Sequence, residues 1–483
     1  MNFTSPLFLF VCMPLWVIFY YLLQGGEHCF PILKKIEIKD WFLAIVSIGF
    51  YSWSGVVNAL KLCVYIIAVY CMGNLIEKGR KDNGRLGFVL LLVGCVGSVL
   101  TLCFFKYMNA IESMFIDFFN KDMHFKSMIA PLGISFITFS ALSYIIDIYR
   151  GSAKAGTFRE AVLYISFFPK VVSGPIILWK DFAIKISNRN IDSEKLLNGI
   201  NRIAIGLSKK VILADTLGTV VQKIQNQTIN GIDGITAWGC AFLYMLQIYY
   251  DFSGYSDVAI GLSGLFGFEV DDNFNFPYTS LSITEFWKRW HISLGKWFKE
   301  YIYFPLGGNR KGSGRTLLNL FIVFLVTGIW HGSGWKYLCW GIMHGICCII
   351  ERCVKGKLWY QRIPKFLRWI STMFIVMIGW ETFRLESLGA VRDFIQIMFG
   401  FRTFSSITFT YNYFFSYKVV CMIIIAVVGS TLFSKEIFKR ELEKLKKLPL
   451  FFCMQESLIL ILMILSIICM TNSTYSPFIY FQY

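Results

Sequence analysis

The sequence predicts an all-α polytopic membrane protein, and three observations support this fold class. Of the 483 residues, 56% are hydrophobic and 18% are aromatic, and the mean hydropathy of +0.57 is far above that of a soluble chain. Apolar runs long enough to span a bilayer recur along the sequence. These runs are continuous and lack the alternation, over about ten residues, that marks the strands of an outer-membrane barrel.

The expected membrane segments extend from one end of the chain to the other. Several are short or interrupted by glycine and proline, so we expect some to be re-entrant, and their lengths predict about eleven true crossings. No soluble domain interrupts them, which favours a single polytopic domain over residues 1–483. The segments are 6–23, 41–56, 58–76, 86–105, 128–148, 160–178, 198–217, 235–262, 316–331, 336–351, 367–381, 417–433 and 456–470.

The net charge of +17 comes from basic clusters that border the apolar segments. Such clusters mark cytoplasmic loops. Residues 1–6 carry no basic side chain and a basic loop follows the first segment, so we expect the N-terminus on the outer side of the membrane. The first segment lacks the features of a cleavable signal peptide. No single basic face is evident, which argues against nucleic acid and leaves the lipid bilayer as the expected partner. The clusters are 34–39, 78–85, 180–189, 288–290, 309–315 and 435–447.

The sequence offers no pattern for a metal site or a disulfide framework. Most of the fourteen cysteines lie inside apolar segments, where cysteine acts as a small hydrophobe, and no CxxC pair occurs. Hydrolase, zinc-protease and dinucleotide-binding motifs are also missing. We therefore expect neither a metal nor a permanently bound cofactor.

The longest polar stretch, about 263–315, contains a predicted amphipathic helix. Ser282 and Glu285 have the spacing of a capping box, so a helix should begin there. Along 286–304 aromatic and apolar residues recur at helical spacing, with lysines and Arg289 mostly on the other side. This pattern predicts a helix that lies at the cytoplasmic membrane interface, with His291 within it.

Two histidines fall inside apolar segments. His331 ends a long uncharged run and is flanked by tryptophans, in the sequence GIWHGSGW of residues 328–335. An ionisable group at membrane depth is expensive, and a histidine there can serve as a general base for a hydroxyl. The alternative is a histidine that only hydrogen-bonds a neighbouring helix. For His344, whose neighbours are glycines, the structural alternative carries more weight.

Two carboxylates also lie in an apolar segment. Asp251 and Asp257 are six residues apart, so one helical face would not hold both, and we predict a helix break at Gly254. We interpret both residues as structural polar anchors of a cavity, with direct catalysis as the alternative.

The motifs resemble those of the membrane-bound O-acyltransferase family, in its bacterial branch of alginate O-acetylation proteins and teichoic acid D-alanyl transferases. The alginate type is the more similar, through residues 286–294, 301–310 and 340–345. The resemblance is strong over about residues 100–351, which it marks as the catalytic core, and weak over the C-terminal transmembrane helices at 352–483. The matching stretches are PLGISFITFSALSYIIDIYRG (131–151), FFPKVVSGPI (167–176), GLSKKVILAD (206–215), QIYYDFSGYSDVAIGL (247–262), NFNFPY (273–278), FWKRWHISLGKWFKEYIYFPLGGNR (286–310), TGIWHGSGW (327–335) and WGIMHG (340–345).

The resemblance implies a ring of helices around a central tunnel that holds the active site. It places the catalytic histidine of the family at His331 and the second family position at His291. It also makes the segment 286–304 a wall of the site. The residues expected to line or support the tunnel are His344, Asp251, Asp257, Ser253, Tyr255, Trp287, Trp290 and Trp330.

The resemblance further implies acyl transfer through the bacterial plasma membrane. An acetyl group would arrive as a cytoplasmic thioester, from acetyl-CoA or an acyl-carrier protein. His331 would take the proton of the attacking hydroxyl, and His291 would orient the donor or stabilise the oxyanion. An extracytoplasmic SGNH-type partner would then pass the acetyl group to an exported or cell-wall polysaccharide.

Three alternative functions remain open from the sequence. One is D-alanyl transfer to teichoic acid from a carrier protein. Another is a transporter or flippase without covalent chemistry, against which the missing internal repeat and the motif series argue. The third is a scaffold for a polysaccharide synthase.

Overall fold

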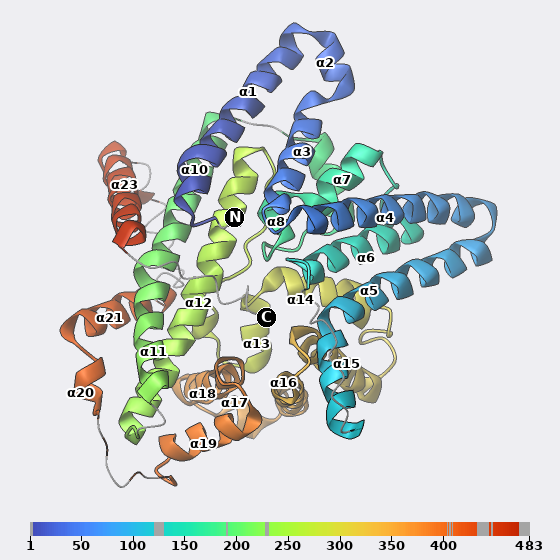
Figure 1. Ribbon diagram of the computed structural model, residues 1–483. Coiled ribbons are helices and arrows are strands. Elements are labelled where there is room, and N and C mark those ends of the chain that lie inside the picture. The colour runs from blue at the N-terminus through green and yellow to red at the C-terminus, as the bar shows by residue number, and fades with distance from the viewer. Residues whose placement is uncertain are drawn as a thin grey trace. The chain divides into compact units, whose positions relative to one another are not determined.

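The computed structural model describes residues 3–119, 130–189, 192–227, 231–402, 404, 407, 409–431, 444–445 and 448–472. Over these residues the regular secondary structure is helical, with two isolated β-bridges and no strand, which confirms the all-α prediction (Figure 1). The chain divides into two compact units. Unit 1 comprises Met1–Ile203 and Val258–Asp271, and unit 2 comprises Ala204–Asp257 and Asp272–Tyr483.

Within the described residues, six helices are long and apolar enough to cross a membrane. They coincide with six of the predicted segments, and the shorter apolar helix Tyr417–Thr431 coincides with a seventh. The remaining predicted segments, apart from 160–178, lie mostly on helices that are not among the six, and residues 128–129 of the segment 128–148 lie outside the described residues. The basic cluster at 435–447 lies almost entirely outside the described residues. The six are Phe8–Glu27, Val56–Asp82, Gly84–Asn109, Ser313–His331, Trp335–Val354 and Pro449–Thr471.

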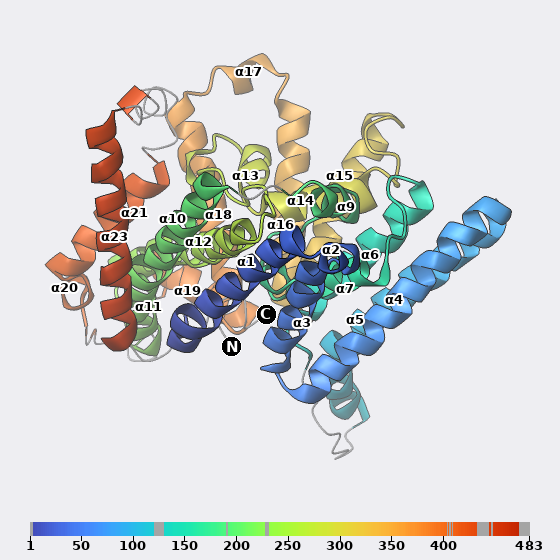
Figure 2. The same ribbon diagram turned by 90° about the horizontal axis from the view of Figure 1, so that it is seen from above.

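Unit 1 is built around a hairpin of two long helices, α4 (Val56–Asp82) and α5 (Gly84–Phe119), which run next to each other in Figure 1 and overlap in the view from above in Figure 2. Helix α6 packs on both of them. The helices of unit 1 are η1 (Phe8–Cys12), α1 (Met13–Cys29), α2 (Pro31–Ile36), α3 (Ile38–Ser52), α4 (Val56–Asp82), α5 (Gly84–Phe119), α6 (Ile134–Arg150), α7 (Phe158–Ser166), α8 (Phe168–Val171), α9 (Trp179–Ser187) and most of α10 (Ser193–Ser208).

The single helical segment predicted at 160–178 is wrong. Helix α7 ends at Ser166, the short helix α8 follows, and an extended stretch leads to α9 at Trp179. Pro169 explains the interruption, because it has no N–H to continue the hydrogen-bond ladder of α7.

Buried ion pairs hold the polar ends of the unit 1 helices together. The Arg189 guanidinium contacts the Asp40 carboxylate, and both side chains are 4% exposed. Arg189 also donates to the Tyr20 hydroxyl at 3.2 Å. The contacts therefore join α1 and α3 to the segment that follows α9.

Unit 2 contains the helices on which the candidate histidines lie. Helices α15 and α16 form a second hairpin, and α18 packs against α16 (Figure 1). The elements are η2 (Lys209–Ala214), α11 (Asp215–Gln227), the larger part of α12 (Gly234–Leu265), η4 (Pro277–Thr279), α13 (Ile283–Arg289), α14 (Ile292–Phe298), η5 (Lys299–Tyr303), α15 (Ser313–His331), α16 (Trp335–Val354), α17 (Leu358–Gln361), α18 (Lys365–Arg384), α19 (Leu388–Met398), α20 (Tyr411–Phe414), α21 (Tyr417–Thr431) and α23 (Pro449–Asn472).

The break predicted at Gly254 is also wrong, because α12 is continuous from Gly234 to Leu265. The glycine serves close packing instead. A Cβ at this position would lie 2.7 Å from the carbonyl oxygen of Gly206 and 3.1 Å from the backbone nitrogen of Lys210. Only a glycine lets the two backbones approach so closely.

The continuous amphipathic helix predicted over 286–304 is interrupted near its start, at residues 290–291. Helix α13 begins at Ile283, as predicted, with Ser282 accepting a hydrogen bond from the Glu285 backbone. It ends at Arg289, and α14 begins at Ile292. The apolar residues of this stretch are mostly buried in unit 2, so they do not form an exposed interfacial face.

The interruption arises from backbone pairing with residues 273–275. The Asn275 N–H donates to the Arg289 carbonyl at 2.9 Å, and the Ile292 N–H donates to the Asn273 carbonyl at 3.0 Å. Trp290 is therefore extended, in a bridge with Phe274. His291, the residue that joins the two helices, has a left-handed backbone with φ 49° and ψ 53°.

Candidate active site

Close packing of α15 against α16 positions His331. A Cβ on Gly328 would lie 2.6 Å from the Tyr337 carbonyl oxygen, and a Cβ on Gly341 would lie 2.5 Å from the Phe324 carbonyl oxygen. Small residues at these two points bring the helix backbones together. His331 is the last residue of α15, and the extended Gly332 turns the chain toward α16.

The His331 ring is 6% exposed and is surrounded by aromatic side chains. Its centroid lies 4.6 Å from that of Trp330, 5.0 Å from that of Trp340 and 5.0 Å from that of Phe383. The last two present their rings at nearly right angles to the imidazole. This packing fixes the ring plane in an apolar environment.

His344 lies on the neighbouring helix α16 and is 1% exposed. The indole N–H of Trp287 donates to its Nδ1 at 3.4 Å. Because an indole can only donate, Nδ1 carries the lone pair and the proton of the neutral ring is on Nε2. Nε2 faces Gly379, where a Cβ would lie only 2.7 Å away. The site therefore holds His344 in one orientation.

His291 is held by Asn273. The side-chain oxygen of Asn273 lies 3.2 Å from Nδ1 of His291 and accepts hydrogen bonds from the Ser293 N–H at 3.1 Å and its hydroxyl at 2.9 Å. The Asn273 amide nitrogen lies 3.3 Å from the Ser256 hydroxyl, to which it donates. The Phe252 ring packs edge-on against the imidazole, with centroids 4.8 Å apart.

These contacts fix the tautomer of His291. A backbone N–H donates to the Asn273 side-chain atom, so that atom must be the oxygen, and Nδ1 of His291 must carry the proton. Burial lowers the pKa of His291 to about 3, so the ring is neutral near pH 7. Nε2 therefore carries the lone pair and can accept a proton or a hydrogen bond.

An aromatic layer connects the surroundings of the histidines. We define it as Phe286, Trp287, Trp290, Trp340, Trp380 and Phe383. Trp290 is next to His291 in the chain, and the centroid of its ring lies 4.7 Å from that of Trp380. The Trp380 centroid lies 5.6 Å from that of Phe383, and Phe383 packs against His331. Trp287 likewise packs on both Trp340 and His344. His331 and His344 thus pack on this layer directly, and His291 follows its member Trp290 in the chain.

The two predicted carboxylates are paired with lysines of the π-helix η2. The Nζ atom of Lys210 lies 2.6 Å from Asp251 and 2.7 Å from Asp215, and the side chains of Lys210 and Asp251 are 2% exposed. Lys209 lies 2.6 Å from Asp257. These pairs join α12 to η2, while Phe252 and Ser256 on another face of α12 contact His291 and Asn273.

Ser253 and Tyr255, the other predicted tunnel residues, are buried side chains of α12. Asn273 was not predicted as a site residue: it lies in the NFNFPY stretch directly after two aspartates, where a polar side chain is unremarkable. The lysines of η2 were also missed, and a pair of basic residues inside an apolar segment was the available signal. Trp380 and Phe383 lie beyond the stretches of resemblance, and nothing in their local sequence marks them.

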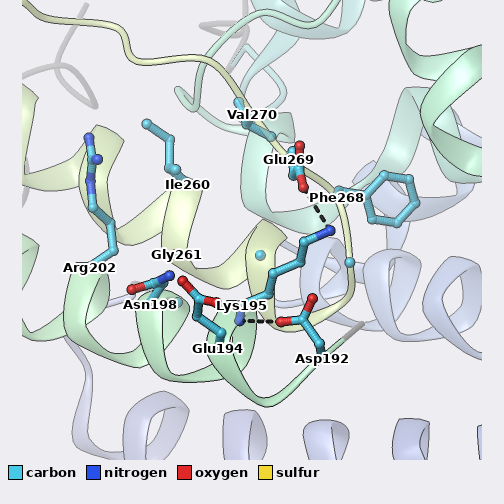
Figure 3. A pocket seen from close by; sticks show the side chains of 13 residues that line it. Asp192, Glu194, Lys195, Asn198, Arg202, Ile260, Gly261, Phe268, Glu269 and Val270 are labelled. Atoms are coloured by element: carbon cyan, nitrogen blue, oxygen red, sulfur yellow. Dashed lines mark hydrogen bonds and ion pairs between the residues drawn. The ribbon is translucent and has the colours of Figure 1, made fainter. Parts of the chain in front are cut away.

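Unit 1 contains a separate polar pocket of about 450 Å³, at the start of α10 and the end of α12 (Figure 3). The Lys195 ammonium lies 2.8 Å from the Glu269 carboxylate, and the Asp192 carboxylate accepts the Lys195 N–H at 2.7 Å. Side chains of both charges line it, and no predicted site residue does so. The pocket therefore offers no support for the catalytic assignment.

Comparisons with known proteins agree with the motif analysis. The family model described as "MBOAT, membrane-bound O-acyltransferase family" matches residues 157–379. The chain is 36% identical to the probable alginate O-acetylase AlgI of Pseudomonas aeruginosa over 83% of this chain and 76% of that protein. It is 29% identical to the peptidoglycan O-acetyltransferase of Helicobacter pylori over 82% and 80% of the two chains. It is 26% identical to the teichoic acid D-alanyltransferase of Bacillus subtilis over 79% and 93%. The chain belongs to the membrane-bound O-acyltransferase family, and it is an integral membrane acyltransferase.

Proposed function

We propose that this protein transfers an acetyl group for the O-acetylation of an exported or cell-wall polysaccharide, in the plasma membrane of a bacterium. The similarity to the alginate O-acetylase of Pseudomonas aeruginosa and the peptidoglycan O-acetyltransferase of Helicobacter pylori supports an acetyl group over other acyl groups. The observation that carries the proposal is the position of His331, a buried imidazole at the end of an apolar helix and within an aromatic layer.

His331 acts as the general base in this proposal. An acceptor hydroxyl gives its proton to the imidazole as its oxygen attacks the thioester carbonyl carbon. The carbon–sulfur bond then breaks, and the imidazolium returns the proton to the leaving thiolate. The apolar surroundings strengthen each of these charge interactions because they exclude water.

Of the two roles that the resemblance implies for His291, we propose orientation of the donor rather than stabilisation of an oxyanion. An oxyanion needs a hydrogen-bond donor, whereas the neutral His291 ring carries its lone pair on Nε2. We therefore assign His291 to accept a hydrogen bond from a substrate hydroxyl or amide. Asn273 positions it, because the Asn273 oxygen keeps the proton on Nδ1 and holds the left-handed turn in place.

The proposal includes the substrates and partners that the family resemblance implies. The donor is a cytoplasmic thioester, either acetyl-CoA or an acyl-carrier protein, and the N-terminus lies outside. An extracytoplasmic SGNH-type protein receives the acetyl group and delivers it to the polymer.

The test is the acetyl content of purified cell-surface polysaccharides in a deletion strain complemented at equal membrane levels. Wild type and Leu318→Ala, an exposed position on the same helix α15, should restore O-acetyl groups. His331→Ala should restore none, and His291→Ala should restore little. Full restoration by His331→Ala would contradict the catalytic assignment and favour a scaffold.

The second candidate function is D-alanyl transfer to teichoic acid, which the similarity to the Bacillus subtilis protein supports at lower identity. In the same deletion strain it predicts a loss of D-alanine esters with unchanged O-acetyl groups. If neither ester changes, both acceptors are excluded and transport should be measured.

A further inference from the structure

Unit 2 contains a second pocket whose wall is entirely apolar. It has a volume of about 360 Å³ and lies among α12, η4, α18 and α21. It is lined by Trp238, Phe242, Met245, Leu246, Tyr278, Trp369, Ile370, Met373, Phe374, Met377, Val427, Ser430 and Thr431. The volume falls within the range of about 300–1,000 Å³ of ligand sites. At roughly 30 Å³ for a water-sized group, it has room for about a dozen methylene-sized groups.

The polar groups of the lining side chains form hydrogen bonds to backbone carbonyls. The indole N–H of Trp238 donates to Met398 and that of Trp369 to Tyr278, each at 2.8 Å. The Tyr278 hydroxyl donates to the carbonyl of Met245. Ser430 and Thr431 both donate to the carbonyl of Val427. A polar ligand would therefore give up its hydrogen bonds to water without replacing them, whereas a hydrocarbon has no hydrogen bonds to give up.

Three of the side chains that line the pocket are apolar and exposed at the surface of the structure. Phe242, Ile370 and Phe374 line the pocket and are 37–42% exposed, and Ile424 and Ile425 beside it on α21 are more than half exposed. In an integral membrane protein such a surface faces acyl chains rather than water.

The chain that leads into α18 is rich in basic residues. Five basic residues occur between α16 and the first turn of α18, and α18 then contributes five residues to the pocket wall, starting at Trp369. Basic residues at the polar end of a membrane helix attract lipid phosphate groups. The five are Lys355, Lys357, Arg362, Lys365 and Arg368.

We propose that this pocket binds one acyl chain of an anionic membrane phospholipid, whose phosphate contacts the basic segment 355–368. The site adjoins the aromatic layer. The Tyr278 ring, which forms part of the wall, stacks on Trp290 with centroids 6.2 Å apart and on Phe286 with centroids 6.4 Å apart. Trp290 precedes His291, so the bound chain supports the wall of the candidate active site from the lipid side.

Bilayer lipid is itself an apolar solvent, so the pocket gains little from the hydrophobic effect alone. Its selectivity must come from close packing and from the phosphate contact. We therefore expect enrichment of a few-fold over ordinary lipid contacts, with slower exchange.

Photolabelling of the full chain in phospholipid nanodiscs tests the proposal. The probe is a phosphatidylglycerol with a diazirine on one acyl chain, and the labelled peptides are mapped by mass spectrometry. Peptides covering 238–246 and 369–377 should be labelled several-fold more than α23, whose lipid-exposed residues report ordinary contacts. Excess unlabelled phosphatidylglycerol should reduce the pocket labelling to a plateau and should compete better than phosphatidylcholine.

Met373→Trp fills the pocket and should remove the excess labelling, whereas Ile424→Trp adds the same bulk to an exposed position and should not. If Met373→Trp fails to accumulate, competition on the unsubstituted protein still decides the question. Equal labelling of the pocket and α23, without competition, would overturn the proposal. Cross-links between two copies through this face would also overturn it and assign the face to an interface.

Discussion

Removal of the Asp251 charge is the most informative test of how unit 2 is stabilised. Asp251→Asn keeps the shape of the side chain but leaves the Lys210 ammonium, 2% exposed, with Asp215 as its remaining carboxylate contact at 2.7 Å. Loss of one partner of a buried ion pair costs about 3–5 kcal/mol. Because Asp215 still compensates part of the charge, we expect about 3 kcal/mol.

The neighbouring pair provides a matched control. Lys209 is 27% exposed, so its ammonium can reach solvent or lipid phosphate when Asp257 is replaced by asparagine. A partly exposed pair contributes about 0–1 kcal/mol. Asp257→Asn should therefore be clearly milder, although both carboxylates lie 2.6 Å from a lysine on the same π-helix.

Thermal unfolding of the purified variants in one detergent measures the difference. The double variant Lys210→Met with Asp251→Leu should recover most of the loss, because apolar replacement of a buried ion pair is often neutral. The reasoning is refuted if Asp251→Asn is no worse than Asp257→Asn, or if the double variant is no better than the single one. Loss of activity without loss of stability in Asp251→Asn would favour a direct catalytic role.

Three further predictions concern the residues around the site. Burial lowers the pKa of His291 to about 3, below its ordinary 6.5, so its contribution to stability is full above pH 6.5 and is lost as the pH falls toward 3, by up to about 1.4 kcal/mol per pH unit. The free energy of unfolding should therefore depend less on pH in His291→Gln across this range, and an equal slope in the two proteins would contradict the assignment. Asn273→Leu removes the acceptor that fixes the His291 tautomer and should lower kcat by roughly 10²–10⁴-fold. Asn273→Asp keeps an acceptor, so it should retain more activity and should shift the pH–rate profile by raising the pKa of His291. Equal losses of activity in the two variants would argue for a packing role of Asn273. Gly254→Ala places a Cβ 2.7 Å from the Gly206 oxygen and should lower the unfolding temperature, whereas Gly264→Ala, with nothing closer than 3.8 Å, should leave it unchanged or raise it.

The fold class could be predicted from the sequence because long apolar runs have few structural solutions in a membrane. Local breaks could not be predicted equally well. Gly254 has the sequence signature of a helix break, yet its reason is the close approach of Gly206, a contact 48 residues away in the chain. The kink at His291 depends on pairing with residues 273–275, and helical periodicity across 286–304 contains no trace of it.

The candidate site was predictable only where chemistry coincides with an unusual local pattern. His331 and His344 are ionisable groups in apolar segments, and so they stand out. Asn273 is recognisable only from its three-dimensional contact with His291, and Phe383 only from its packing on His331. Tertiary contacts of ordinary residues leave no signal in a single sequence.

The left-handed backbone of His291 is strained, and the contacts of its buried side chain hold it in place. A left-handed conformation costs a residue with a side chain about 1–3 kcal/mol, and glycine adopts it freely. His291→Gly would relieve this strain, but it would also remove a buried imidazole that packs on Phe252 and bonds Asn273. The cavity left by such a deletion costs about 2–5 kcal/mol, so the substitution would lose both stability and the second histidine. Engineering of this enzyme for robustness should keep residue 291 fixed and take its gains elsewhere.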